Sequence, residues 1–206
     1  MNRTTLVVLK ILTWTACLWL AARLVWGAVT NNLGPDPTAR IAFSTGLATL
    51  YLLTLTLAVT PLRRIWPRLG WLIKFRRLLG LFAFFYATLH MLTYVALYSG
   101  FSLAAMESDI ARRRFITMGV AAYILLVPLA LTSTTWAIRK LGGRNWNRLH
   151  KLVYVAVICG VIHYWWQVKT GVLKPLDITI VVAVLLLARP AINLAQRRRT
   201  RSSVPA

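Results

Sequence analysis

The chain alternates between long apolar runs and short segments rich in arginine and lysine. A helix needs about 20 residues to cross the hydrocarbon core of a bilayer, and six of the runs reach that length. They lie near residues 6–28, 41–60, 78–98, 115–136, 149–168 and 176–194. The pattern therefore predicts an all-α membrane protein, a six-transmembrane helix bundle, in which residues 1–206 form a single domain.

The first run could also be interpreted as a secretory signal peptide, because Arg3 and Lys10 precede its apolar stretch. No convincing small-residue cleavage site follows, and the stretch continues past Arg23 to Trp26. A membrane span is the better interpretation of this segment.

Composition narrows the possible functions. Hydrophobic residues make up 58% of the 206 positions, so little chain is left for a soluble catalytic domain. The sequence also contains no G-x-G-x-x-G element for binding a dinucleotide. The chain itself is therefore not expected to bind a nicotinamide dinucleotide, and any catalytic site acting on an aqueous substrate would lie in a partner.

The charged residues predict an orientation. The chain has 25 basic and 4 acidic residues, a formal charge of +21, and most basic residues fall on one side of a six-span arrangement. The positive-inside rule places that side, with both termini, in the cytoplasm. Because these cations cap hydrophobic helices, we expect membrane lipid headgroups as their counter-charge and no nucleic acid.

Two of the three histidines lie at similar depth on different predicted spans. His90 follows the basic residue Arg77 by 13 positions, and His163 follows Lys151 by 12. Both imidazoles would lie roughly 18 to 20 Å from the inner boundary, where they could share one iron. Each could instead be a core histidine hydrogen-bonded to a neighbouring helix. Because both have aromatic neighbours, we predict that His90 and His163 are axial ligands of a heme iron.

The cysteines limit the type of heme. Cys17 and Cys159 both lie within predicted spans, and no C-x-x-C-H motif occurs. Covalent attachment of heme and a cysteine-ligated iron–sulfur cluster are therefore excluded, which leaves a b-type heme.

His150 and its basic neighbours allow several interpretations. His150 would lie about 20 Å inward of His163 by helical rise, but the chain has no fourth histidine to complete a second pair. It could bind a second heme with a different or shared ligand, contact another cofactor, or be an interfacial residue beside Trp146. Nearby arginines could bind heme propionates or a flavin phosphate, although topology alone would also explain them. They are Arg76, Arg77 and Arg148.

Several short stretches together resemble a known family. They are FRRLLGL at 75–81, YATLH at 86–90, LTST at 131–134, WNRLHKLVY at 146–154 and IHY at 162–164, with GPDP at 34–37 and VTPL at 59–62. In order and spacing they are similar to the MsrQ (YedZ) family, the heme-binding membrane subunits of a bacterial periplasmic protein-methionine-sulfoxide reductase. The resemblance extends over essentially the whole chain.

This resemblance implies a ferric-reductase-like transmembrane domain in the bacterial inner membrane. It also implies heme b and FMN as cofactors, and electron transfer from quinol to a periplasmic molybdopterin subunit that reduces methionine sulfoxide. Two alternatives stay open: a stand-alone ferric or quinone reductase of the cytochrome b561 or STEAP kind, and a non-redox membrane anchor or transporter.

The outer connections are candidates for docking a partner. They comprise residues 30–40, 99–114 and 169–175. The second is the longest and carries both signs of charge, with Glu107 and Asp109 close to three arginines, Arg112, Arg113 and Arg114. We predict that these arginines steer a protein partner electrostatically, although they could equally bind lipid phosphates.

Overall fold

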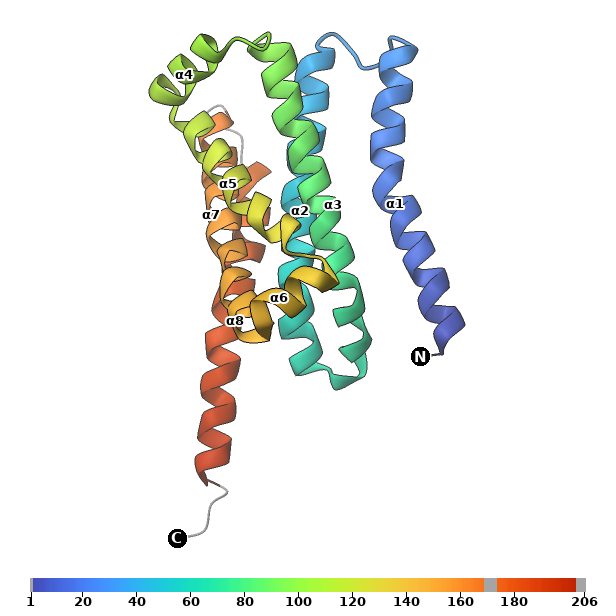
Figure 1. The fold of residues 1–206 in the computed structure, drawn as a ribbon, viewed down its shortest axis with the longest axis vertical. Helices are drawn as coiled ribbons and strands as arrows, with labels where there is room; N and C mark the ends of the chain where they lie inside the picture. Colours follow the sequence, from blue (N-terminus) through green and yellow to red (C-terminus); the bar gives the residue numbers. More distant parts are fainter. Residues whose placement is uncertain (1, 169–173, 203–206) are drawn as a thin grey trace.

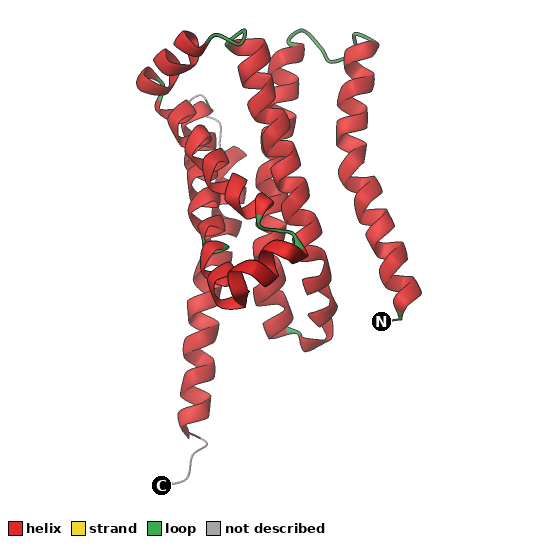
Figure 2. Ribbon diagram, viewed as in Figure 1, coloured by secondary structure: helices red, strands yellow, loops and turns green. Residues whose placement is uncertain are grey.

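The computed structural model describes residues 2–168 and 174–202, and the regular structure of these residues is helical throughout (Figure 2). The α-helices are α1 (Arg3–Val29), α2 (Pro37–Ile65), α3 (Ile73–Thr93), α4 (Leu103–Arg112), α5 (Arg114–Leu131), α6 (Thr135–Leu149), α7 (Leu152–Gln167) and α8 (Lys174–Ser202). A 3₁₀ turn, Pro67–Leu72, precedes α3, and a π-helical segment, Tyr94–Tyr98, extends it.

The helices confirm the predicted class of an all-α integral membrane protein. Among the described residues, five helical segments are long and apolar enough to span a membrane. A sixth span results if α6 and α7, bent by 43° at their junction, are counted together as one broken span. The large apolar side chains exposed on α1 and α8 suit contact with lipid tails.

The core is formed by two antiparallel hairpins. One hairpin pairs α2 with α3, and the other pairs α5 with α7 (Figure 1). The two meet where Phe84 of α3 stacks on Tyr123 of α5, with ring centres 5.7 Å apart. Helix α8 packs against α2 and α7. The four helices of the two hairpins, α2, α3, α5 and α7, form a bundle that contains most of the fully buried side chains, including Leu57, Ala83 and Val157.

The two ends of the bundle differ in charge. The start of α1, the α2–α3 connection and the end of α8 lie at one end, and α4 lies at the other (Figure 1). Asp36, Glu107 and Asp109 lie at the α4 end, on the α1–α2 connection and on α4 itself. Most of the third predicted outer connection, residues 169–173, lies outside the described residues.

Two segments differ from the sequence prediction. The fourth span was expected to continue to Trp136, but α5 ends at Leu131. Thr132 and Ser133 follow the last helical residue, and their hydroxyls donate hydrogen bonds to the carbonyls of Pro128 and Leu129 in the last turn. Thr134 then caps α6 by accepting a hydrogen bond from the Ala137 amide. The connection at 99–114, expected to be a loop, contains the surface helix α4, which is capped by Ser102.

Helix α6 lies across the bundle (Figure 1). It is interrupted at Gly142, where φ is 73°, a left-handed value that glycine adopts without steric cost. Its basic residues, including Arg139, Arg144 and Arg148, therefore lie on a short broken helix.

Helix α1 is attached to the bundle through the side chain of Tyr86. The Tyr86 hydroxyl donates to the Cys17 carbonyl and accepts from the Ala21 amide, at 3.2 Å. These two backbone groups are four residues apart in the continuous helix α1, so one hydroxyl contacts both groups of a single helical turn. Trp14 adds an edge-to-face contact with Phe82. Tyr86 is thus the main polar link between α1 and α3.

We expect Tyr86→Phe to destabilise the attachment of α1 by less than about 1 kcal/mol, because Cys17 and Ala21 are placed to bond to each other along the helix once the hydroxyl is removed. Tyr86→Ala should cost about 3–5 kcal/mol, since it also removes a buried ring. The rate of maleimide labelling at Cys17, measured in a Cys159→Ser background, reports the difference. Equal rates in the parent and in Tyr86→Ala would show that Tyr86 does not hold α1 in place.

Candidate functional site

His90 and His163 come together between the two hairpins. His90 lies on α3 and His163 on α7, and their ring centres are 5.9 Å apart with planes at 84° to each other. Two residues that are 73 positions apart in the sequence therefore face one another across the bundle. The structure brings together the pair that the sequence selected by depth.

Each imidazole is fixed by a backbone carbonyl of the first helix of its own hairpin. His90 Nδ1 lies 2.8 Å from the Ala42 oxygen on α2, and His163 Nδ1 lies 2.6 Å from the Phe115 oxygen on α5. A carbonyl can only accept, so each Nδ1 carries the proton. In this tautomer Nε2 keeps its lone pair for a metal, the arrangement that commonly orients metal-binding histidines.

Glycines make room for both rings. A Cβ atom at Gly46 on α2 would lie 3.0 Å from Cε1 of His90, and one at Gly119 on α5 would lie 2.8 Å from Nδ1 of His163. These separations are too short for ordinary side-chain contacts. Only glycine at these two positions allows the rings to lie directly against the facing helices.

The two hairpins repeat the same arrangement. Both histidines bond to a carbonyl 48 residues earlier in the chain. Both also lie 44 residues after the glycine they touch. The same shift of 73 residues relates further buried positions, such as Ala83 with Ala156 and Leu53 with Leu126. The site is therefore an internal two-fold repeat with one histidine from each half.

The geometry fits a heme iron bound by two histidines. Metal–imidazole bonds are about 2 Å long, so ring centres on opposite sides of one metal are separated by roughly 6 Å, close to the spacing found here. The histidines line a cavity of about 260 Å³, whose wall includes Gly46, Gly119 and Ala87. Small residues next to two free Nε2 atoms provide space for a flat cofactor between the helices.

His150 lies in a different environment at the junction of α6 and α7. Its Nε2 lies 3.2 Å from the Thr132 hydroxyl, and Trp146 stacks on its ring with centres 3.8 Å apart. The Trp146 indole donates to the Thr132 carbonyl at 2.9 Å. Under the 73-residue shift His150 corresponds to Arg77, so the repeat supplies no second histidine at this end.

The arginines selected from the sequence are not grouped together. Arg76 is half-buried and close enough to His150 to act on it electrostatically, whereas Arg77 and Arg148 are exposed. At the opposite end, Arg112 ends α4, Arg114 begins α5, and Arg113 between them lines the histidine cavity. The structure therefore separates Arg113 from the two neighbours with which the sequence grouped it.

Sequence reasoning missed the residues that support the histidines. The carbonyls of Ala42 and Phe115 carry no side-chain signal, and Gly46 and Gly119 resemble ordinary glycines of membrane helices. The equal spacing from each glycine to its histidine was a signal that could have identified them.

Comparisons with known proteins identify the family to which this chain is similar. The ferric reductase like transmembrane component family matches residues 41–161, which contain His90 and most of the four-helix core. A protein-methionine-sulfoxide reductase heme-binding subunit MsrQ of Ralstonia nicotianae is 47% identical over 176 residues, covering 85% of this chain and 80% of the relative. The protein of the same name from Herminiimonas arsenicoxydans is 45% identical, covering 89% and 85%. That from Rhodospirillum rubrum is 41% identical, covering 94% and 92%.

Proposed function

The chain belongs to the MsrQ family of ferric-reductase-like transmembrane proteins, and we propose from this that it is a heme b subunit that supplies electrons to a methionine-sulfoxide reductase. In this proposal the electrons come from quinol in the bacterial inner membrane. The acceptor is a periplasmic, molybdopterin-containing reductase that repairs oxidised proteins. The catalytic site lies in that partner, and this chain carries the electrons across the membrane.

The observation that carries the proposal is the facing pair His90 and His163. Their Nδ1 protons are committed to backbone carbonyls, so both rings can present Nε2 to one iron without reorganising. A bound heme would supply one-electron redox chemistry at this position. Most of the cavity wall is apolar, and the glycines let the rings approach the facing helices.

The charge distribution supports the proposed orientation. The end of the bundle near α4 carries acidic residues, while the α2–α3 connection and α6 carry clusters of arginine and lysine. The positive-inside rule then places both termini in the cytoplasm and the histidine pair nearer the periplasm. FMN is included in the proposal by family resemblance, without residues assigned to it.

The proposal is tested by reconstitution. Purified protein is loaded with heme, placed in liposomes and mixed with quinol and the periplasmic reductase. The redox state of the heme is followed by its absorption spectrum, and the reduction of methionine sulfoxide is measured in parallel. We expect quinol to reduce the heme, and the reductase to reoxidise it. Failure of quinol to reduce the heme would exclude it as donor. Rapid reduction of soluble ferric salts without the reductase would favour the stand-alone reductase instead.

His150 is expected to affect electron entry rather than the outer heme. Its Nε2 already contacts Thr132, and its ring stacks on Trp146, at a distance from the histidine pair. We expect His150→Ala to keep the His90–His163 heme spectrum and to slow quinol-linked reduction or alter a second cofactor. Thr132→Val is the matched control for loss of the hydroxyl contact. Normal cofactor content and normal turnover in His150→Ala would identify it as an interfacial residue.

Arg112, Arg113 and Arg114 are all exposed, but Arg113 also lines the histidine cavity, so the docking prediction is tested on Arg112 and Arg114. We expect Arg112→Glu combined with Arg114→Glu to slow heme reoxidation by the reductase several-fold, because the reversed charges weaken steering of the partner. Stopped-flow reoxidation rates measured across ionic strength test this. An unchanged rate and salt dependence would exclude this surface from docking.

A further inference from the structure

The cavity next to the histidines is polar at one end and apolar at the other. Tyr94 lies one helical turn outward from His90, and Gln167 lies one turn outward from His163. The inward end is lined by Leu53, Leu126 and Ala156. A cofactor with one charged and one apolar edge would therefore bind with its charged edge outward.

Arg113 is the one permanently charged side chain among the described residues that line this cavity. It lies at the polar end, two positions before Phe115, whose carbonyl fixes His163. A heme carries two carboxylates on the same edge of its ring. Arginine is well suited to bind a carboxylate, because its terminal amino groups donate two parallel hydrogen bonds.

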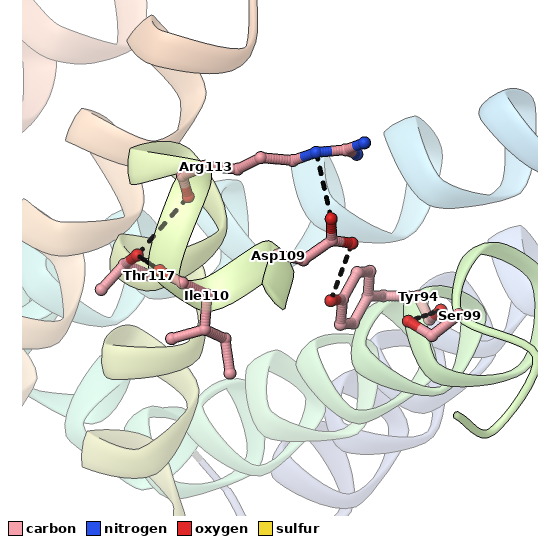
Figure 3. A network of polar contacts seen from close by, with 6 residues as sticks. All are labelled: Tyr94, Ser99, Asp109, Ile110, Arg113 and Thr117. Carbon is pink, nitrogen blue, oxygen red and sulfur yellow. Dashed lines mark hydrogen bonds and ion pairs between the residues drawn. The ribbon is translucent and has the colours of Figure 1, made fainter. Parts of the chain in front are cut away.

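A short polar network determines where the Arg113 side chain lies (Figure 3). Its Nε pairs with Asp109 Oδ1 at 3.1 Å, and Asp109 Oδ2 accepts a hydrogen bond from the Tyr94 hydroxyl at 3.2 Å. The ion pair uses Nε and so leaves the forked pair of terminal amino groups for another acceptor. Asp109 thus links Arg113 to the segment that directly follows the His90 helix.

The backbone around Arg113 is also held in place. The Thr117 hydroxyl donates to the Ile110 carbonyl at 2.6 Å and to the Arg113 carbonyl at 3.4 Å (Figure 3). These bonds join the end of α4 to the first turn of α5. The arginine is thereby presented from a junction of two helices rather than from a free loop.

We propose that Arg113 binds a propionate carboxylate of the heme, with Asp109 and Tyr94 positioning its guanidinium. This inference rests on the proposed heme site and deepens it: it fixes which edge of the cofactor faces the outer end, and it gives Arg113 a role different from that of Arg112 and Arg114. The propionate edge would then be the part of the heme nearest to a docked electron acceptor.

The internal repeat supplies a matched control. Under the 73-residue shift Arg113 corresponds to Arg40, and Asp109 corresponds to Asp36. Asp36, however, caps α2 through the Ala39 amide, and Arg40 is not among the residues lining the cavity. Arg40→Gln therefore removes the same charge at the equivalent position without removing the proposed contact.

The test compares Arg113→Gln with Arg40→Gln using two cofactors. Protein prepared without heme is loaded with hemin or with hemin dimethyl ester, whose carboxylates are blocked, and the rate of cofactor loss to apomyoglobin is measured. We expect Arg113→Gln to lose hemin about tenfold faster than the parent, since a charge-assisted hydrogen bond is removed. Loss of the dimethyl ester should be unchanged within about twofold, and Arg40→Gln should match the parent with both cofactors.

Two outcomes would overturn the inference: equal rates of hemin loss from Arg113→Gln and Arg40→Gln, or equal acceleration of the loss of both cofactors in Arg113→Gln. If Arg113→Gln does not load, Arg113→Lys replaces it, with an intermediate acceleration expected for hemin alone, and parent-like rates with both cofactors would overturn the contact. Failure of the parent protein to give a bis-histidine heme spectrum would instead reject the proposed function. The two failures are therefore distinguishable.

Discussion

Replacing either His90 or His163 by alanine is expected to abolish the low-spin heme of the protein. Each variant removes one of the two imidazoles whose ring centres lie 5.9 Å apart, so the iron would lose an axial ligand. We expect the heme content to fall to roughly a tenth of that of the parent, or the remaining heme to become high-spin. Electron transfer from quinol to the partner should stop in both variants.

The measurement combines pyridine hemochrome quantification with optical and electron paramagnetic resonance spectra. His150→Ala is the control for the low-spin spectrum alone, because it removes the same side chain at a place where the imidazole contacts Thr132 and Trp146 instead of another histidine. Parent-like spectra in both His90→Ala and His163→Ala would show that the facing pair does not bind the iron.

The second large effect is expected from a single added methyl group. A Cβ at position 119 would lie 2.8 Å from Nδ1 and 3.0 Å from Cε1 of His163, whose ring is held by the Phe115 carbonyl. Gly119→Ala must therefore move the ring and break that hydrogen bond. Loss of such an orienting contact commonly reduces metal affinity by about 10–100-fold, and we expect a reduction of heme affinity in this range.

A graded series of glycine variants tests the steric explanation. Gly46→Ala should have a smaller effect, since its Cβ would lie 3.0 Å from His90 Cε1. Gly80→Ala should be nearly neutral, because Gly80 does not line the cavity and its nearest neighbour would be Thr56 Cγ2 at 4.0 Å. Hemin titration of the four proteins, including the parent, ranks the affinities. Similar affinities for Gly119→Ala and Gly80→Ala would contradict the role of the close contact.

The hydrophobic pattern was sufficient to predict the class and the main helices, because bilayer thickness imposes a minimum length on each apolar run. The pattern did not predict the helix ends where hydroxyl side chains bond to the backbone within an apolar run. Thr132, Ser133 and Thr134 end α5 and begin α6 by hydrogen-bonding to the backbone, although the surrounding residues are apolar. The amphipathic helix α4 was also missed, because its length is too short for a span and its residues carry both charges.

For the candidate site, the sequence predicts the depth of the two histidines but not the residues that pack against them. Counting residues from the basic anchors gives the depth of His90 and His163, and depth is what a straight helix preserves along its axis. Which helices face each other depends on side-chain packing between distant segments. The contacts of His90 with Gly46 and of His163 with Gly119 follow from that packing, as does the entry of Arg113, but not Arg112, into the cavity wall.

The internal repeat has a consequence for assembly. In each half, the histidine, the carbonyl that orients it and the glycine that it touches belong to a single hairpin, α2–α3 or α5–α7. The first half is therefore complete before the second has been synthesised, because a growing chain emerges from its N-terminal end. A cofactor held by both histidines would be clamped only when the second hairpin docks against the first. Its binding would therefore report correct pairing of the two hairpins.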